Sequence, residues 1–124
     1  MSELIFKAES YQIIGLCMEV HRELGRGHNE IIYKEALQYE LGLNQIPFTR
    51  EKEYTVQYKR IILAHKYYAD FVVLDKILLE LKAVEGLVDS HVKQVLNYIA
   101  AAKLKLGLLV NFGEDSLVYK RIVP

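Results

Sequence analysis

The sequence contains few of the residues that mark secreted or multidomain proteins. Its 124 residues include one cysteine, two prolines and no tryptophan. Cys17 cannot form an internal disulfide and lies among apolar residues, so we expect a buried thiol in a cytoplasmic protein. Pro47 and Pro124 mark no internal linker, and no repeat divides the chain. A single domain over residues 1–124 is therefore expected.

Net charge and long apolar segments are also missing. Sixteen basic residues balance sixteen acidic ones, so no global field attracts nucleic acid or a membrane surface. No segment is apolar over the width of a bilayer, and the first residues do not resemble a signal peptide. Zinc-ligand clusters, phosphate-binding glycine loops and Ser/His/Asp arrangements are absent from the sequence. A nucleic-acid site would therefore depend on local charge or on a metal ion.

The sequence does contain an ordered series of amphipathic and apolar segments. Helical spacing of apolar residues predicts helices over residues 9–24 and 30–41, with Asn29 as a cap and Gly42 as a stop. A third helix is expected to begin at a Ser90 cap. Strands are expected at residues 51–58 with an extension at 61–64, then at 67–74, 77–84, 106–112 and 117–123, the last at a sheet edge. A meander followed by a helical crossover to a buried strand implies an α/β protein with a mixed sheet.

Three charged residues interrupt the most apolar part of the chain. Asp70 lies on one expected strand, and Glu80 and Lys82 lie on one face of the next. Buried charges normally pair or hold a metal, so Asp70 and Glu80 could bind a divalent cation while Lys82 orients or deprotonates water. Alternatively, Glu80 and Lys82 pair with each other or with neighbours on a solvated sheet face.

The loop between these strands tests the two alternatives. A two-residue turn at Asp75-Lys76 would place Asp70 and Glu80 on opposite faces of the sheet. A shared site requires an odd-length loop near residues 74–77, or a bulge between the two acids.

The order of elements, with Asp70, Glu80-x-Lys82 and an acid in the preceding helix, resembles the PD-(D/E)XK nuclease superfamily. Residues 27–33 read G-x-x-E-x-x-Y, and the segments EVHRELGRG, ELKAVE and LGLLVNFG resemble those of small prokaryotic GxxExxY proteins grouped with that superfamily. The resemblance covers about residues 13–123. It implies a restriction-endonuclease-like core of helix, three-strand meander, helix and strand, with an additional N-terminal helix and a C-terminal edge strand.

The resemblance also implies roles for particular residues. Asp70 and Glu80 would bind Mg²⁺ or Mn²⁺, with the Leu81 carbonyl as a further ligand, and Lys82 would serve the attacking water. Gln94 begins a Q-x-x-x-Y element that ends at Tyr98 and resembles one in RecB-like nucleases. On a helix, His91, Gln94 and Tyr98 form a polar ridge that could reach a phosphate, hold Lys82 or face solvent. The expected catalytic residues are Glu30, Asp70, Glu80, Lys82 and Gln94.

The remaining candidates have structural alternatives. Glu30 shares a helical stripe with Tyr33, so we expect its carboxylate on the packed side and favour a site role over a helix-dipole role. His21 is expected to be a satisfied core or interface histidine. Four tyrosines could stack on bases or simply pack: Tyr54, Tyr58, Tyr67 and Tyr68.

Two functions fit these patterns. The first is a Mg²⁺- or Mn²⁺-dependent nuclease that acts on DNA or RNA, with DNA the favoured substrate. The second is a non-catalytic binding or assembly module that keeps the nuclease fold, because the chain has no net charge and is scarcely larger than the core. A homodimer would give either one a larger groove.

Overall fold

Two helices precede the first strand, as the periodicity predicts. The computed structural model describes residues 4–124. Its elements are α1 (Lys7–Leu24), α2 (Glu30–Leu43), β1 (Phe48–Tyr58), β2 (Ile61–Val73), β3 (Ile77–Lys82), α3 (Asp89–Ala102), β4 (Leu106–Asn111) and β5 (Val118–Ile122). No helix within residues 4–124 is long and apolar enough to cross a membrane.

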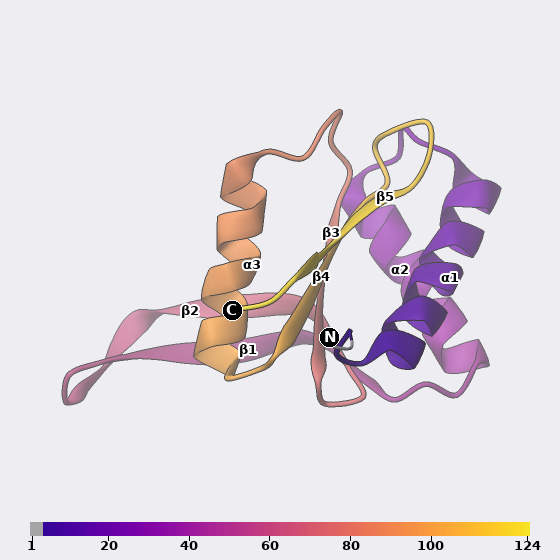
Figure 1. Cartoon of the computed structure of the whole chain (residues 1–124). Coiled ribbons are helices and arrows are strands. Elements are labelled where there is room, and N and C mark those ends of the chain that lie inside the picture. The colour runs from indigo at the N-terminus through magenta and orange to yellow at the C-terminus, as the bar shows by residue number, and fades with distance from the viewer. Residues whose placement is uncertain (1–3) are drawn as a thin grey trace.

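The strands form one mixed sheet in the order β1-β2-β3-β4-β5. β3 and β4 are parallel, and the other neighbours are antiparallel. A parallel pair needs a long crossover connection, and α3 provides it. The mixed α/β sheet, the additional N-terminal helix and the C-terminal edge strand are all confirmed (Figure 1).

Several predicted boundaries are wrong. α3 begins at Asp89 with Val88 as its N-cap, so Ser90 lies within the first turn instead of capping it. Asn29 occupies the N-cap position of α2 without a capping hydrogen bond from its side chain, and the helix continues through Gly42. The segments predicted at 61–64 and 67–74 are one strand, because antiparallel pairing with β1 continues along both.

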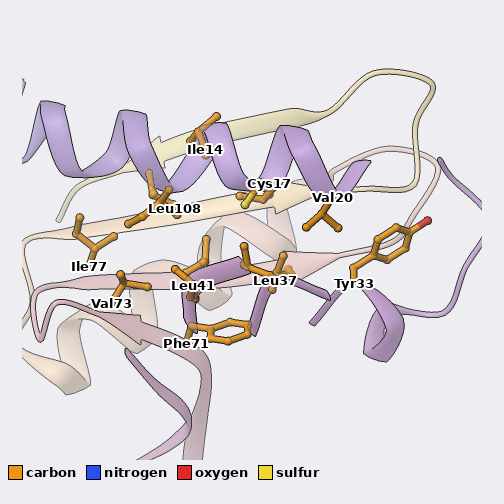
Figure 2. Close-up of a cluster of buried hydrophobic side chains, with 14 of the residues drawn as sticks. Ile14, Cys17, Val20, Tyr33, Leu37, Leu41, Phe71, Val73, Ile77 and Leu108 are labelled. Atoms are coloured by element: carbon orange, nitrogen blue, oxygen red, sulfur yellow. The ribbon is translucent and has the colours of Figure 1, made fainter. Parts of the chain in front are cut away.

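The two faces of the sheet carry separate cores. α1 and α2 cover one face, where Leu37, Leu41, Phe71 and Leu108 belong to a cluster of 17 buried residues. Figure 2 shows the helical side chains of this cluster meeting those of the strands. α3 covers the other face with a cluster of seven buried residues. The sheet is therefore buried on both faces only where helices lie over it.

The β1–β2 hairpin extends beyond this covered region. β1 has 11 residues and β2 has 13, whereas β3 and β4 have six each. Figure 1 shows the hairpin passing the end of α3 and continuing away from all three helices. We call residues 55–68 the arm. Twelve of its 14 residues are exposed, and Val56 and Tyr67 are half-buried.

Candidate active site

A three-residue loop sets the register of the two strands that carry the acids. Val73 pairs with Ile77, so residues 74–76 form the loop, and two of them adopt a left-handed φ. Continuing this register one step beyond its last pair, Phe71 with Leu79, brings Asp70 opposite Glu80. Opposite residues of antiparallel strands project to the same face. The odd-length loop that a shared site requires is therefore confirmed.

The two carboxylates bridge the strands just beyond their regular pairing. The backbone N–H of Asp70 donates to Glu80 Oε1 at 2.9 Å, and the N–H of Leu81 donates to Asp70 Oδ2 at 2.8 Å. Asp70 is 5% exposed and Glu80 3% exposed. One oxygen of each carboxylate is engaged by backbone, which leaves Asp70 Oδ1 and Glu80 Oε2 for other partners.

Burial and like charge perturb the protonation of this pair. Removal from water disfavours the charged form of Glu80, and repulsion by Asp70 acts in the same direction, so the pKa of Glu80 lies well above its usual range. The hydrogen bond from the Asp70 N–H and, to a smaller extent, the attraction of Lys82 lower the pKa of Glu80 but offset this change only in part. Full ionisation of both buried carboxylates requires a nearby cation. The site is therefore suited to bind one.

Lys34 of α2 provides a cation that the sequence patterns did not identify. Its Nζ lies 2.8 Å from Asp70 Oδ1, 3.3 Å from Glu30 Oε1 and 3.7 Å from Glu51 Oε1. Burial disfavours the charge, but the hydrogen bond to Asp70 and the attraction of the three carboxylates outweigh it and raise the pKa of Lys34. Its i,i+4 spacing from Glu30, which places both side chains on one helix face, could have indicated this role.

Glu51 of β1 is a second site residue that no sequence pattern identified. The β1–β2 register places it opposite Asp70, and its φ of 52° is left-handed. Such a conformation is costly for a non-glycine residue and is often found at functional sites. Here it accompanies a break in the regular pairing, where the Glu51 carboxylate faces Lys34 at 3.7 Å.

Lys82 is held by the polar ridge of α3. Its Nζ donates to Gln94 Oε1 at 2.8 Å, and Gln94 Nε2 donates to the Tyr98 hydroxyl at 3.3 Å. The Tyr98 ring packs against Tyr67 with centroids 4.8 Å apart. His91 is not part of this chain of contacts, because its Nδ1 accepts a hydrogen bond from the Val88 N–H at the helix start. Of the three roles considered for the ridge, the structure shows the one that holds Lys82.

Comparisons with known proteins agree with this arrangement. A family model described as the PD-(D/E)XK nuclease superfamily matches residues 7–122. The chain belongs to the PD-(D/E)XK nuclease superfamily. A solved structure titled "Crystal structure of SSO0001" is similar with a TM-score of 0.57 and 19% identity, over 76% of this chain and 50% of that one. The chain thus spans half the length of that protein, and the likeness concerns the fold alone. No curated protein matches the sequence.

The oxygen donors suit the divalent ion that PD-(D/E)XK nucleases typically use. Within residues 4–124, no group of three or more His, Cys, Asp or Glu side chains is placed to hold a metal. Asp70 and Glu80 form a pair of buried carboxylates that are candidate donors. Mg²⁺ commonly takes one or two carboxylates and keeps several waters, which is compatible with such a pair. Leu81 lies beside both acids through its backbone, whose N–H binds Asp70.

Glu30, the third acid expected in a PD-(D/E)XK site, is connected to it only through Lys34. Its stripe partner Tyr33 is fully buried, but the Glu30 side chain is 39% exposed. The expectation that its carboxylate faces the packed side holds only in part, because Glu30 is half-buried at the first residue of α2 and its carboxylate turns to Lys34. Among the described residues, its ionic partner is Lys34.

Two other candidates are structural. His21 is buried, and its Nε2 lies 2.9 Å from the Glu114 carbonyl oxygen, which confirms a satisfied core histidine. Cys17 is fully buried in the α1–α2 core, where removal from water raises the pKa of its thiol to about 12. A thiol protonated at all physiological pH values is a poor nucleophile. Neither residue belongs to the site.

Proposed function

We propose that the protein is a metal-dependent nuclease that hydrolyses phosphodiester bonds of DNA, with Mg²⁺ or Mn²⁺ as cofactor. One observation carries the proposal: Asp70 and Glu80 face each other where β2 and β3 stop pairing regularly, and Lys82 follows on the same face of β3. Membership of the PD-(D/E)XK superfamily supports nuclease chemistry. The raised pKa of Glu80 is typical of a carboxylate placed for chemistry instead of stability.

The acids and one carbonyl would hold the ion. Asp70 Oδ1, Glu80 Oε2 and the Leu81 carbonyl are the proposed donors, since backbone N–H groups already occupy the other carboxylate oxygens. A bound divalent ion lowers the pKa of its water and offsets charge on the phosphate. Lys34 contacts Asp70 Oδ1, so it has to release this oxygen or share it when an ion is present.

Lys82 would act directly on the reacting groups. Its ammonium donates one N–H hydrogen bond to Gln94 Oε1, which leaves two N–H groups to bond the attacking water or a phosphate oxygen. In the hydrolysis, the water oxygen bonds to phosphorus and the water gives up a proton to solvent. The bond from phosphorus to one sugar oxygen breaks, and that leaving oxygen takes up a proton from solvent. Gln94 is a positioning residue because it fixes Lys82. Glu30 has the same relation to Lys34.

We also assign the chain to the GxxExxY group of the superfamily. The first and last residues of the motif fix the loop before the site helix. Gly27 has a φ of 106°, which only glycine adopts readily. The Tyr33 hydroxyl donates to the Gly25 carbonyl at 2.6 Å and accepts from the His28 N–H at 3.2 Å. The motif thus orients α2, which carries Glu30 and Lys34.

A non-catalytic module is the second candidate. The ammonium of Lys34 already offsets the charge of Asp70 without a bound metal ion. A protein that uses the fold only for binding or assembly would need no further cation at this position. Such a module is expected to act in the cytoplasm, as a homodimer where a larger surface is needed. Sedimentation velocity would report the oligomeric state.

Metal binding separates the two candidates. We would titrate Mg²⁺ and Mn²⁺ into the wild-type protein, Asp70→Asn and Glu80→Gln by calorimetry, and measure cleavage of duplex DNA by the same proteins. The nuclease proposal expects both variants to lose ion binding and to cleave at least about 100-fold more slowly. Asp75→Asn is the matched control, because Asp75 is an exposed acid in the adjacent loop. Unchanged cleavage in both variants would reject the proposed mechanism.

A further inference from the structure

The arm is a two-stranded ribbon that meets α3 only near its base, where Tyr67 packs on Tyr98. Its strands pair antiparallel from Thr55 opposite Lys66 to Tyr58 opposite Ile61, with a register shift between Thr55 and Gln57. Figure 1 shows the outer part of the arm continuing beyond the end of α3, away from all three helices. An uncovered ribbon exposes apolar side chains at its tip, where Tyr58 is 55%, Ile61 58% and Ile62 65% exposed. Side chains of this kind gathered at one exposed place mark a binding surface.

The charge of the arm has a single sign. Residues 55–68 contain Lys59, Arg60 and Lys66 and neither aspartate nor glutamate. The whole chain is neutral, so this excess is local. Lys66 pairs with Glu53 at the base of the arm, whereas Lys59 lies over the Tyr58 ring at the tip. A basic surface with exposed aromatic and apolar groups matches a phosphate backbone and bases.

A groove lies beside the base of the arm, on the side of α3. It encloses about 540 Å³ and is lined by residues that include Gln57, Tyr67, Asn97 and Lys103. Tyr67 packs on Tyr98, which is bonded to Gln94, the residue that holds Lys82. A chain of contacts therefore runs from the base of the arm, through Tyr67, Tyr98 and Gln94, to Lys82.

The dimensions favour a duplex. Arg60, in the turn before β2, is ten positions from Asp70 in the sequence, about 33 Å at roughly 3.3 Å per strand residue. One turn of B-form DNA rises about 34 Å, and its major groove admits a two-stranded ribbon. The major groove of A-form RNA is too narrow for side chains to read. Docking of two arms against each other is disfavoured, since it would oppose the basic residues of two copies.

We propose that the arm lies in the major groove of double-stranded DNA about one helical turn from the phosphate that Asp70, Glu80 and Lys82 act on. Lys59, Arg60 and Lys66 contact phosphates, and the exposed apolar side chains at the tip contact base edges such as thymine methyl groups. The inference rests on the proposed nuclease function only for the position of the cleaved phosphate. Duplex binding by the arm is a separate property.

Fluorescence anisotropy tests the arm apart from catalysis. The full chain carrying Glu80→Gln is titrated, in EDTA, with a labelled duplex of roughly 30 base pairs, about three helical turns, between about 50 and about 200 mM salt. Adding Lys59→Ala, Arg60→Ala and Lys66→Ala should weaken binding at least about tenfold and flatten the slope of log Kd against log salt by about 2–3.

A matched control removes three positive charges, the same number, from surfaces outside the arm. Arg22→Ala, Arg26→Ala and Lys120→Ala alter exposed residues of α1, the following loop and β5, and should leave affinity within about threefold. Equal affinity for the arm and control variants would overturn the inference. So would a wild-type dimer that dissociates on Ile61→Ser and Ile62→Ser, if duplex affinity is unaffected by the basic substitutions.

The two proposals can fail separately. Duplex binding through the arm without divalent-ion binding at Asp70 and Glu80 would remove the nuclease function and leave the arm as a DNA-binding ribbon. Metal-dependent cleavage with an unchanged rate and affinity in the arm variant would retain the nuclease and reject the arm.

Discussion

The two faces of the sheet are buried to very different extents. α1 and α2 together bury 17 residues against one face, and α3 alone buries seven against the other. Glu80 and Lys82 alternate with the α1–α2 core residues of β3, so both project to the α3 face. We call the face under α1 and α2 the two-helix face and the face under α3 the one-helix face. The two-helix face contributes most of the buried core, and the one-helix face has room for charged groups and a groove.

The largest effect should come from breaking the two-helix face. Leu37→Ala removes a fully buried side chain of α2 and should lower the free energy of unfolding by about 3–5 kcal/mol. Leu96→Ala makes the same change on α3, where the side chain is half-buried, and should cost about 1–2 kcal/mol. Urea denaturation measures both. Equal losses of unfolding free energy in the two variants would show that the two faces contribute equally to stability.

Replacing the buried acid Glu80 by glutamine should stabilise the metal-free protein. The pKa of Glu80 is raised on folding, so the folded state binds more protons than the unfolded state, and stability falls as pH rises above the ordinary carboxyl range. Glu80→Gln abolishes that fall. We expect similar stability at pH 5 and a gain on the order of 1–3 kcal/mol at pH 8, since a tenfold displacement of a protonation equilibrium is worth about 1.4 kcal/mol. Urea denaturation in EDTA at both pH values would measure the gain; a loss of stability at pH 8 would contradict it.

Lys34 of α2 reaches the site from the two-helix face and should compete with a divalent ion for Asp70 Oδ1. Lys34→Gln frees Asp70 Oδ1 and should tighten Mn²⁺ binding about tenfold, equivalent to about 1.4 kcal/mol, as measured by calorimetry. Lys76→Gln is the control, because Lys76 pairs with Glu9 of α1 instead. Weaker binding in Lys34→Gln would show that the ammonium supports the metal site.

The smallest effects concern the ridge on α3. Gln94→Ala removes the partner of Lys82 and should slow cleavage about tenfold with Mn²⁺ affinity unchanged, because hydrogen bonds to charged groups contribute about 1.5–3 kcal/mol. Tyr98→Phe removes only a long bond of 3.3 Å between neutral groups and should slow cleavage about threefold or less. Single-turnover rates compare the two. A larger effect of Tyr98→Phe would assign the hydroxyl a direct role.

Local patterns predicted the elements and the pair of acids well. The alternation of residues around Glu80 and Lys82, and the parity of the 74–76 loop, depend only on neighbours in sequence. Helix starts were less predictable, since Val88 serves as N-cap with help from the His91 ring. That contact exists only in the folded helix.

The site residues that were not predicted come from tertiary structure. Lys34 approaches Asp70 because α2 packs over β2, and Glu51 turns inward through a left-handed φ in the middle of a strand. Neither position carries an unusual residue type in the sequence. Gln94 was predicted through the spacing of its motif, but its partner became evident only from the packing of α3 on β3.

The hairpin that carries the two acids has a consequence for the order of folding. Asp70 and Glu80 are ten residues apart and meet by closing one short loop, an event of about 1–10 μs for a β-hairpin. Lys34 and Gln94 join them only after α2 and α3 have packed on the sheet, which involves contacts between distant parts of the chain and is slower. We therefore expect the acids to come together before their protein partners arrive. A divalent ion present during folding could reach the pair first, and refolding in Mn²⁺ should then be faster than in EDTA.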